Sequence, residues 1–195
     1  PANNASIVGI FQDSLLGAYQ FTRPDIKFDQ LQAMNLLMSF NKIDPAGLKN
    51  KQITNFDILS QIMPPMTMKT PNKAFRESGE EFKSSNHVIE IIAGKYVRGQ
   101  LDKGILGSGS IGLLQRVCNY FGNMASADFV DNLQNIITEY MKTSAYSVGI
   151  SDLIANKETN DKIVNTITEK KKEVKNLIDQ THLGIFENKT GKSNV

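Results

Sequence analysis

The feature that most constrains the fold is an amphipathic stripe in the second half of the chain. Apolar residues recur there at helical spacing, at Phe129, Val130, Leu133, Ile136, Ile137, Tyr140 and Met141. This period places them on one face of an α-helix and does not match the alternation of a strand. A helix of this kind needs other segments to cover its apolar face. Because 40% of the residues are hydrophobic, the chain can supply a core of that size.

Further helices are predicted where apolar residues keep a helical spacing between capping and breaking residues. They are expected from about Gln12 to Pro24, from Asp29 to about Phe40, from Thr54 to Met63, and from Ile111 to Phe121, with Gly122-Asn123 before the stripe. In the second of these, Leu31, Met34, Leu37, Met38 and Phe40 carry the apolar pattern. A charged helix from about Glu158 to Leu183, ending at Gly184, completes the chain.

Strands are expected to be few. Ser6–Phe11 is interpreted as a short buried strand, and residues 88–92 and 95–98 as a hairpin whose turn is Ala93-Gly94. Residues 99–103 can extend that sheet, whereas residues 64–86, with three prolines and no sustained period, indicate a long loop. The expected fold class is therefore α+β, mostly helical with a small antiparallel sheet and a long charged helix at the end.

Composition excludes several classes of protein. The 22 Lys and Arg nearly balance the 20 Asp and Glu, so no bulk charge favours nucleic acid or membranes. No apolar run approaches the roughly 18 residues of a membrane span. One cysteine cannot form an internal disulfide, which fits a reducing compartment, and two histidines offer no zinc ligand set. A start at Pro1 without Met suggests a piece of a longer protein.

A glycine-rich motif, Gly107 to Gly112, has the GxGxxG pattern of dinucleotide-binding proteins, and Asp131 follows near the distance of a ribose-binding acid. That function requires a parallel strand before the first glycine and a second strand ending at the acid. Residues 101–104 make a poor strand, and Asp131 lies within the amphipathic stripe. A flexible turn is the favoured interpretation, with a dinucleotide-binding domain as an alternative.

The final charged helix carries a second apolar pattern. Lysines and carboxylates are interleaved on it at pairing distances, which is typical of a solvated face. An apolar seam, formed by Val164, Ile167, Val174 and Ile178 and interrupted at Lys171, follows coiled-coil steps. A single helix cannot bury this seam, so we expect a second helix to cover it. A helical protein–protein interaction module is therefore another alternative.

Several motifs together resemble one family. In order, they are Ser6–Gly17, Phe56–Pro64, Gly94–Lys103 with Gly107, Tyr120–Asn123, and Ser147–Asp152. This series resembles the part of the largest subunit of eukaryotic-type, multi-subunit DNA-directed RNA polymerases that follows the catalytic aspartate loop. The resemblance extends to about Leu183, matches poorly over residues 41–54 and 64–86, and departs mildly at Ser151, where glycine is usual. Large DNA viruses also carry divergent copies of this subunit.

The resemblance implies a pore domain over residues 1–143 and the start of the funnel domain over residues 144–195. In this family the pore and funnel shape a secondary channel, through which nucleoside triphosphates enter and into which backtracked RNA is extruded. Implied partners are other polymerase subunits, template DNA, RNA and nucleoside triphosphates in transit, with no membrane. An intracellular location follows, nuclear for a cellular protein and cytoplasmic or virion-associated for a viral one.

The resemblance also implies where the chemistry resides. The assembled enzyme is a nucleotidyltransferase whose magnesium is held by an aspartate-rich loop expected before Pro1, and no such cluster occurs in this sequence. We therefore predict no catalytic residue, no metal ligand and no activity for this chain alone. Arg98, Lys103 and Arg116 are the candidates for lining the channel. Gln12 and Asp13 are predicted to be architectural, satisfying backbone donors where a strand passes into a helix.

Overall fold

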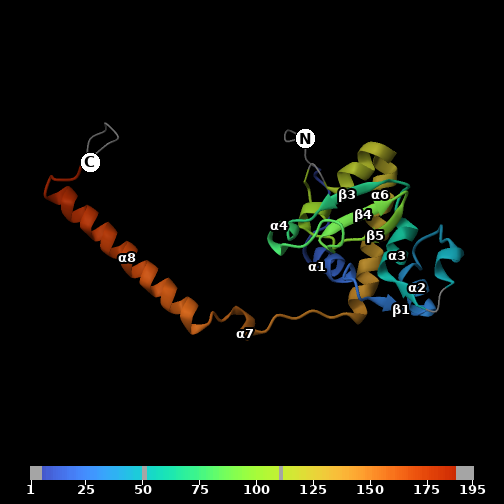
Figure 1. Cartoon of the computed structure of the whole chain (residues 1–195), viewed down its shortest axis with the longest axis horizontal. Coiled ribbons are helices and arrows are strands. Elements are labelled where there is room, and N and C mark those ends of the chain that lie inside the picture. Colours follow the sequence, from blue (N-terminus) through green and yellow to red (C-terminus); the bar gives the residue numbers. More distant parts are fainter. Residues whose placement is uncertain (1–5, 50–51, 110–111, 188–195) are drawn as a thin grey trace. The chain divides into compact units, whose positions relative to one another are not determined.

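The computed structural model describes residues 6–49, 52–109 and 112–187 (Figure 1). The chain divides into two compact units, residues 1–145 and residues 146–195. Helices predominate in both, and strands occur only in small antiparallel sheets of the first unit among the described residues. The predicted α+β class is confirmed. Assignment of the two units to pore and funnel stays a prediction.

The core of the first unit forms around α6 (Leu113–Thr143), which contains the amphipathic stripe. Five stripe residues are buried, namely Phe129, Leu133, Ile136, Ile137 and Tyr140. The helix is kinked at Gly122, whose φ of 87° and ψ of 173° are open to glycine but strained for other residues. The predicted break at Gly122-Asn123 is therefore confirmed as a kink within one long element.

Helix α1 (Gln12–Phe21) lies directly on α6. A Cβ atom at Gly17 would fall 2.5 Å from Ile137 Cγ2, so only glycine allows this approach. The rings of Phe21 and Tyr140 meet edge to face with centroids 5.1 Å apart. Short helices α2 (Gln30–Leu36) and α3 (Asn55–Ile62) also contact α6, as does α5 (Lys103–Leu106). These contacts supply the covering segments that the stripe requires.

A three-stranded antiparallel sheet of order β3-β4-β5 forms the other side of the first unit. Its strands are β3 (Met68–Pro71), β4 (Val88–Ile92) and β5 (Lys95–Arg98). The predicted hairpin is confirmed, with Ala93 at φ 48° and Gly94 at φ 82° in its turn. A second, two-stranded sheet pairs β1 (Lys27–Phe28) with β2 (Ile53–Thr54), and η1 (Pro45–Leu48) lies between them in sequence.

Two helix starts follow the sequence closely. Asp29 caps α2, accepting from Gln32 N at 2.7 Å, and Thr54 caps α3, accepting from Asp57 N at 3.1 Å. Both form reciprocal capping boxes, which satisfy backbone donors at the helix start. The prediction for α2 is wrong in two respects, because the helix ends at Leu36 and Leu31, Met34 and Met38 are exposed. Leu37 is buried as predicted, together with Ala33 and Leu36, which the predicted pattern did not include.

The prediction of a strand over Ser6–Phe11 is wrong. These residues form no strand, and Ile7 and Val8 are exposed by 81% and 62%. Only Ile10 is buried, and its N–H donates to Leu106 O at 2.9 Å, an isolated bond rather than a ladder. A run of apolar residues favours a strand only where a neighbouring strand is available to pair with it.

Two further predictions, for residues 64–86 and 99–103, also need correction. The stretch of residues 64–86, interpreted as a loop, contains β3 and the short helix α4 (Phe75–Ser78). Strand β3 depends on distant pairing with β4, with Met68 opposite Ile91, and four residues are too few for a periodic signal. Residues 99–103 do not extend the sheet, because Gly99 turns at φ 116° and Asp102 then caps α5.

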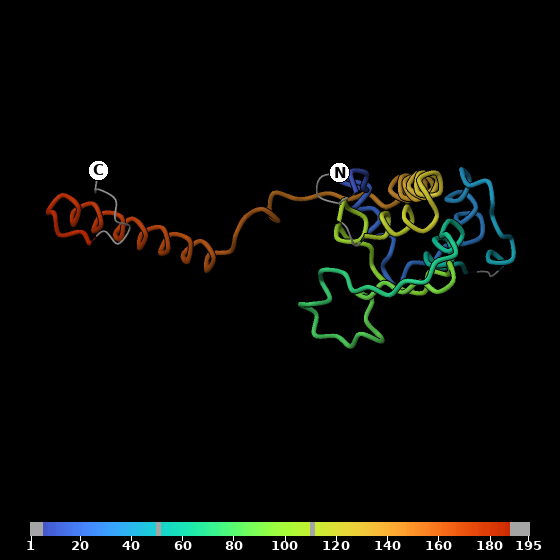
Figure 2. Tube along the Cα trace, turned by 90° about the horizontal axis from the view of Figure 1, so that it is seen from above, coloured from blue at the N-terminus to red at the C-terminus, as the bar shows by residue number. Residues whose placement is uncertain are grey.

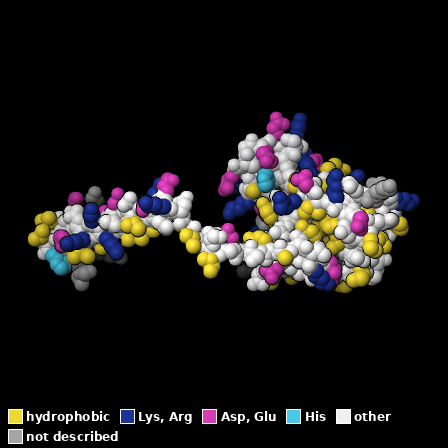
Figure 3. All heavy atoms as spheres, turned by 90° about the horizontal axis from the view of Figure 1, so that it is seen from below, with side chains coloured by type: hydrophobic (Ala, Val, Ile, Leu, Met, Phe, Trp, Pro, Cys, Tyr) yellow, Lys and Arg dark blue, Asp and Glu magenta, His cyan; other side chains and the backbone are white. Residues whose placement is uncertain are grey.

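The second unit contains α7 (Ile150–Leu153) and α8 (Lys157–His182). Helix α8 confirms the predicted charged helix, with Asn156 as its cap and Gly184 at φ 69° after its end. No residue of α8 is buried, and the seam residues Val164, Ile167, Val174 and Ile178 are exposed. Apolar side chains run along this helix beside charged ones (Figure 3). No helix of the described residues could span a membrane.

Candidate functional site

Arg98, predicted to line a channel, lies at the end of β5 and is engaged within the fold. Its Nε is 2.8 Å from Glu90 Oε2 on the neighbouring strand. Its Nη1 donates to Ser85 O at 2.6 Å and its Nη2 to Phe82 O at 3.1 Å. The side chain is only 14% exposed. Arg98 therefore fastens the segment between β3 and β4 to the sheet, a structural function that the sequence did not indicate.

Glu90 receives a second cation on its other side. Lys69 Nζ lies 2.8 Å from Glu90 Oε1, and the same ammonium group is 5.4 Å from the centre of the Phe82 ring. Hydrogen bonds from Lys69 and Arg98 hold the pKa of Glu90 below its ordinary value, outweighing the opposing effect of burial. The outer face of the sheet thus carries a linked ion network rather than free cations.

Lys103, the second candidate, is the first residue of α5 and is exposed. Its carbonyl accepts from Gly107 N at 2.9 Å, which ties it to the glycine-rich turn. Arg116, the third candidate, lies half-buried in the first turn of α6, with its N–H donating to Gly112 O at 3.3 Å. Lys103 and Arg116 therefore flank the turn in sequence, whereas Arg98 belongs to the sheet. The roles of Lys103 and Arg116 in a channel stay predictions.

Beside Lys103 lies a hollow of about 530 Å³, here named the basic groove. Its lining residues come from the end of β3, the segment after it and the start of α5: Thr70, Pro71, Asn72, Lys73, Arg76, Asp102, Gly104 and Ile105. Sequence reasoning missed Lys73 and Arg76, because they fall in the stretch interpreted as a loop. No local signal could have joined them to α5, since the hydrogen bonds that link the two segments, from Asn72 to Gln100 and from Lys73 to Asp102, join residues 28 and 29 positions apart.

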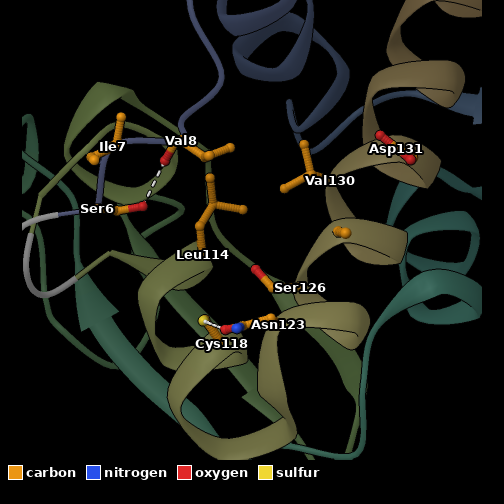
Figure 4. A pocket seen from close by; sticks show the side chains of 10 residues that line it. Ser6, Ile7, Val8, Leu114, Cys118, Asn123, Ser126, Val130 and Asp131 are labelled. Carbon is orange, nitrogen blue, oxygen red and sulfur yellow. Dashed lines mark hydrogen bonds between the residues drawn. The ribbon is translucent and has the colours of Figure 1, made fainter.

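A second, largely apolar groove of about 440 Å³ lies between the segment before α1 and the two halves of α6 (Figure 4). Its labelled lining includes Ile7, Val8, Leu114 and Val130, with Asp131 at one side. The Cys118 thiol donates to Asn123 Oδ1 at 3.1 Å across the kink. Neither histidine of the chain lines this groove, so the thiol has no imidazole base there. The groove offers an apolar surface rather than a nucleophilic centre.

The dinucleotide alternative fails on geometry. Helix α5, not a strand, precedes Gly107, and both sheets of the described residues are antiparallel. Asp131 lies inside α6 rather than at a strand end. Ser110 and Ile111 of the motif lie outside the described residues. The arrangement that would bring a pyrophosphate to a helix start beside a parallel sheet is therefore not formed by the described residues.

The junction residues Gln12 and Asp13 are both exposed at the start of α1. The cap position is held by Phe11, and no side chain caps this helix, so the predicted capping role of Asp13 is wrong. Since no strand precedes the helix, the expected strand-to-helix junction is absent among residues 6–11. Gln12 adopts φ 53°, an unusual conformation for a residue with a side chain.

No three His, Cys, Asp or Glu side chains in the described ranges are gathered closely enough to hold a metal ion. The carboxylates that stand near the candidate residues are occupied otherwise. Glu90 pairs with Lys69 and Arg98, while Asp102 accepts from two backbone N–H groups. Glu90 and Asp102 are therefore already engaged within the fold.

Comparison with known proteins gives a consistent result. The family model described as RNA polymerase Rpb1, domain 3, matches residues 1–153. DNA-directed RNA polymerase subunit 1 of Acanthamoeba polyphaga mimivirus is 30% identical over 175 residues, which cover 89% of this chain and 11% of that protein. DNA-directed RNA polymerase II subunits RPB1-A and RPB1-B of Trypanosoma brucei brucei are each 29% identical over 174 residues, covering 85% of this chain and 10% of theirs. The chain spans about a tenth of the length of these curated relatives.

Proposed function

Since the chain belongs to the RNA polymerase Rpb1 domain 3 family, we propose that it forms part of the secondary channel of a DNA-directed RNA polymerase. In this proposal residues 1–143 form the pore domain and residues 144–195 the start of the funnel. Nucleoside triphosphates pass this wall on their way to the active centre, and backtracked RNA is extruded along it. The function of the segment is to shape the passage rather than to carry out chemistry.

The observation that supports the proposal best is the exposed position of Lys103. It lies within the matched residues, next to a glycine-rich turn where the backbone can approach a ligand closely. A cation in such a wall raises the local concentration of anionic triphosphates. Arg98 is not included among the channel-lining cations of this proposal, because its guanidinium group pairs with Glu90 and donates hydrogen bonds to two backbone carbonyl groups.

Nucleotidyl transfer belongs to the assembled enzyme in this proposal. Magnesium would supply two-metal activation of the attacking and leaving oxygens there, held by an aspartate-rich loop in another part of the subunit. The partners are other polymerase subunits, template DNA and RNA. The isolated chain should show no nucleotide polymerisation and no magnesium binding tighter than about millimolar by calorimetry, because its carboxylates are dispersed.

A second function, helical interaction with another segment or protein, is favoured by α8. The exposed residues Val164, Ile167, Val174 and Ile178 form a seam, and the four-residue α7 of the same unit is too short to cover it. A partner helix would bury these side chains and contribute roughly 1.5 to 3 kcal/mol for each one fully buried. This function is compatible with a funnel assignment.

The test of the channel proposal uses an assembled polymerase that carries Lys103→Glu. The apparent KM for nucleoside triphosphates should rise most at low salt, because screening weakens long-range attraction at high ionic strength. Lys42→Glu, at another exposed lysine, is the matched control and should leave the KM unchanged. An equal effect of Lys103→Glu at all ionic strengths would point to misfolding and contradict the proposal.

A further inference from the structure

The basic groove lies at the base of the segment between β3 and β4, which projects from the rest of the first unit (Figure 2). Lys73 and Arg76 contribute the positive charge of its lining, and both side chains are exposed. The ion pairs of the described residues include neither of them. This distinguishes them from Arg98, whose charge is already neutralised within the sheet.

The acidic member of the lining is occupied by the backbone. Asp102 Oδ1 accepts from Ile105 N at 3.1 Å, and Asp102 Oδ2 accepts from Lys73 N at 2.9 Å. One oxygen of Asp102 thus caps α5, and the other fixes the backbone at Lys73. Neither the Lys73 nor the Arg76 side chain forms an ion pair with Asp102. The lining carries two positive charges, at Lys73 and Arg76, against one negative charge at Asp102, so its net charge is positive.

The backbone that carries these cations is anchored. Asn72 is 4% exposed, its Nδ2 donates to Gln100 O at 3.0 Å, and its Oδ1 accepts from Phe75 N at 3.1 Å. The Asn72 N–H also donates to His87 O at 2.8 Å. A buried asparagine with partners on both sides fixes the chain immediately before Lys73. The groove is therefore preorganised at its base, which lowers the entropy cost of binding.

The lining also has an exposed apolar residue, Pro71, whereas Ile105 is buried and offers little surface to a ligand. We propose that the basic groove binds a nucleotide unit, with Lys73 and Arg76 contacting phosphate and with Pro71 against the base or ribose. Two cations three residues apart suit a polyphosphate or neighbouring phosphodiesters. This inference deepens the proposed function and rests on it for the source of the nucleotide, which is either an entering triphosphate or extruded RNA.

The test is a titration of the full 195-residue chain, followed by amide chemical shifts in NMR. The probes are ATP, a six-nucleotide uridine RNA, and adenosine, which lacks phosphate. ATP or the RNA should shift amides of residues 72–76 and 102–105, whereas adenosine at the same concentration should shift them far less. The probe that binds more tightly identifies the source, because a triphosphate favours ATP and neighbouring phosphodiesters favour RNA.

Variants then assign the binding to the two cations. Lys73→Glu with Arg76→Glu should weaken binding about tenfold or more, and should reduce the logarithmic salt slope by about 0.7 for each RNA phosphate that is no longer neutralised. Lys73→Arg with Arg76→Lys keeps the charge and should retain binding. Lys42→Glu is the matched charge reversal at a lysine outside the groove and should bind as the unaltered chain does. Unchanged amide shifts far from the groove confirm that each variant is folded.

Three outcomes would overturn the inference: no shifts of residues 72–76 at millimolar ATP or RNA, shifts that survive the double reversal, or equal shifts with adenosine. These outcomes are separate from failure of the channel proposal. If the isolated chain binds the probes but Lys103→Glu leaves the KM of an assembled polymerase unchanged, the groove proposal stands and the channel proposal fails. If Lys103→Glu raises the KM but the isolated chain does not bind the probes, the channel proposal stands and the groove proposal fails.

Discussion

Arg98 and Glu90 face each other across the β4–β5 pair, with Arg98 Nε 2.8 Å from Glu90 Oε2. The two residues are register partners because the pairing shifts by one residue between Glu90 and Ile91; a regular hairpin would place Val97 opposite Glu90. The remaining nitrogens of Arg98 hold the carbonyl groups of Ser85 and Phe82. One side chain therefore joins two strands and the projecting segment.

Arg98→Ala should lower the free energy of unfolding by about 1.5 to 3 kcal/mol, the range for hydrogen bonds to a charged group that is largely shielded from water. Urea denaturation monitored by circular dichroism measures this change. Lys95→Ala, at an exposed position of the same strand, should be nearly neutral and serves as the control. Equal midpoints for the two variants would mean that Arg98 is not a structural clamp.

Stability should fall in mild acid partly through Glu90. Its pKa is lowered in the folded state by hydrogen bonds from Lys69 and then Arg98, so between the folded pKa and the ordinary value of 4.5 the unfolded chain binds more protons. The stabilisation is therefore present above pH 4.5 and is lost as the pH falls through the folded pKa. Glu90→Gln should be less stable than the unaltered chain at pH 7, and the difference should shrink toward pH 3. A constant difference across this range in thermal melts would contradict the assignment.

Asn55→Ala should be more damaging than an average substitution. The buried Asn55 amide donates to Phe21 O at 2.5 Å and Arg23 O at 2.7 Å, and its Oδ1 accepts from Phe56 N at 3.0 Å. Removal leaves two carbonyl groups unsatisfied where α1 ends, at a cost of about 3 kcal/mol. The exposed Asn35→Ala is a matched control with an expected change under about 0.5 kcal/mol. Similar unfolding midpoints for both would refute the junction role of Asn55.

Asp13→Ala and Asp29→Ala should lower the free energy of unfolding by different amounts, although both replace an aspartate at a helix start. Asp29 is a true cap with a reciprocal box, so its loss should cost about 1 kcal/mol. Asp13 has no capping bond and acts only through the helix dipole, which contributes about 0.3 to 1 kcal/mol and weakens in salt. Denaturation in 0.1 M and 1 M salt separates the two cases. A salt-independent loss at Asp13 equal to that at Asp29 would restore a capping role.

Helix α8 should be the least independently stable part of the chain. It has no buried residue, and helices held by local interactions alone fray in water. Hydrogen exchange in dilute solution should be rapid from Asp161 to Thr181. Protection that rises with protein concentration would show pairing of the seam between copies, as exposed apolar seams favour. Strong protection in a proven monomer, without docking of the helix onto the first unit, would contradict the need for a partner helix.

The sequence by itself determined the elements whose causes are local. The stripe from Phe129 to Met141, the caps at Asp29 and Thr54 and the Ala93-Gly94 turn were all predictable, because spacing, capping chemistry and turn conformation depend on near neighbours. The resemblance to the polymerase family was also readable, since short motifs in a fixed order survive without any knowledge of contacts.

Only the tertiary structure decided which apolar and charged side chains find partners. Ile7 and Ile10 have the same local pattern, yet one is exposed and the other is buried with its N–H on Leu106. Arg98 and Lys103 looked equivalent as channel residues, but the strand register gives Arg98 a carboxylate partner and leaves Lys103 exposed. Hydrogen bonds between distant residues, from Asn72 to Gln100 and from Lys73 to Asp102, likewise hold Lys73 and Arg76 at the groove beside Asp102. Burial and ion pairing depend on residues far apart in the chain, whose proximity is fixed by the folded core and not by local spacing.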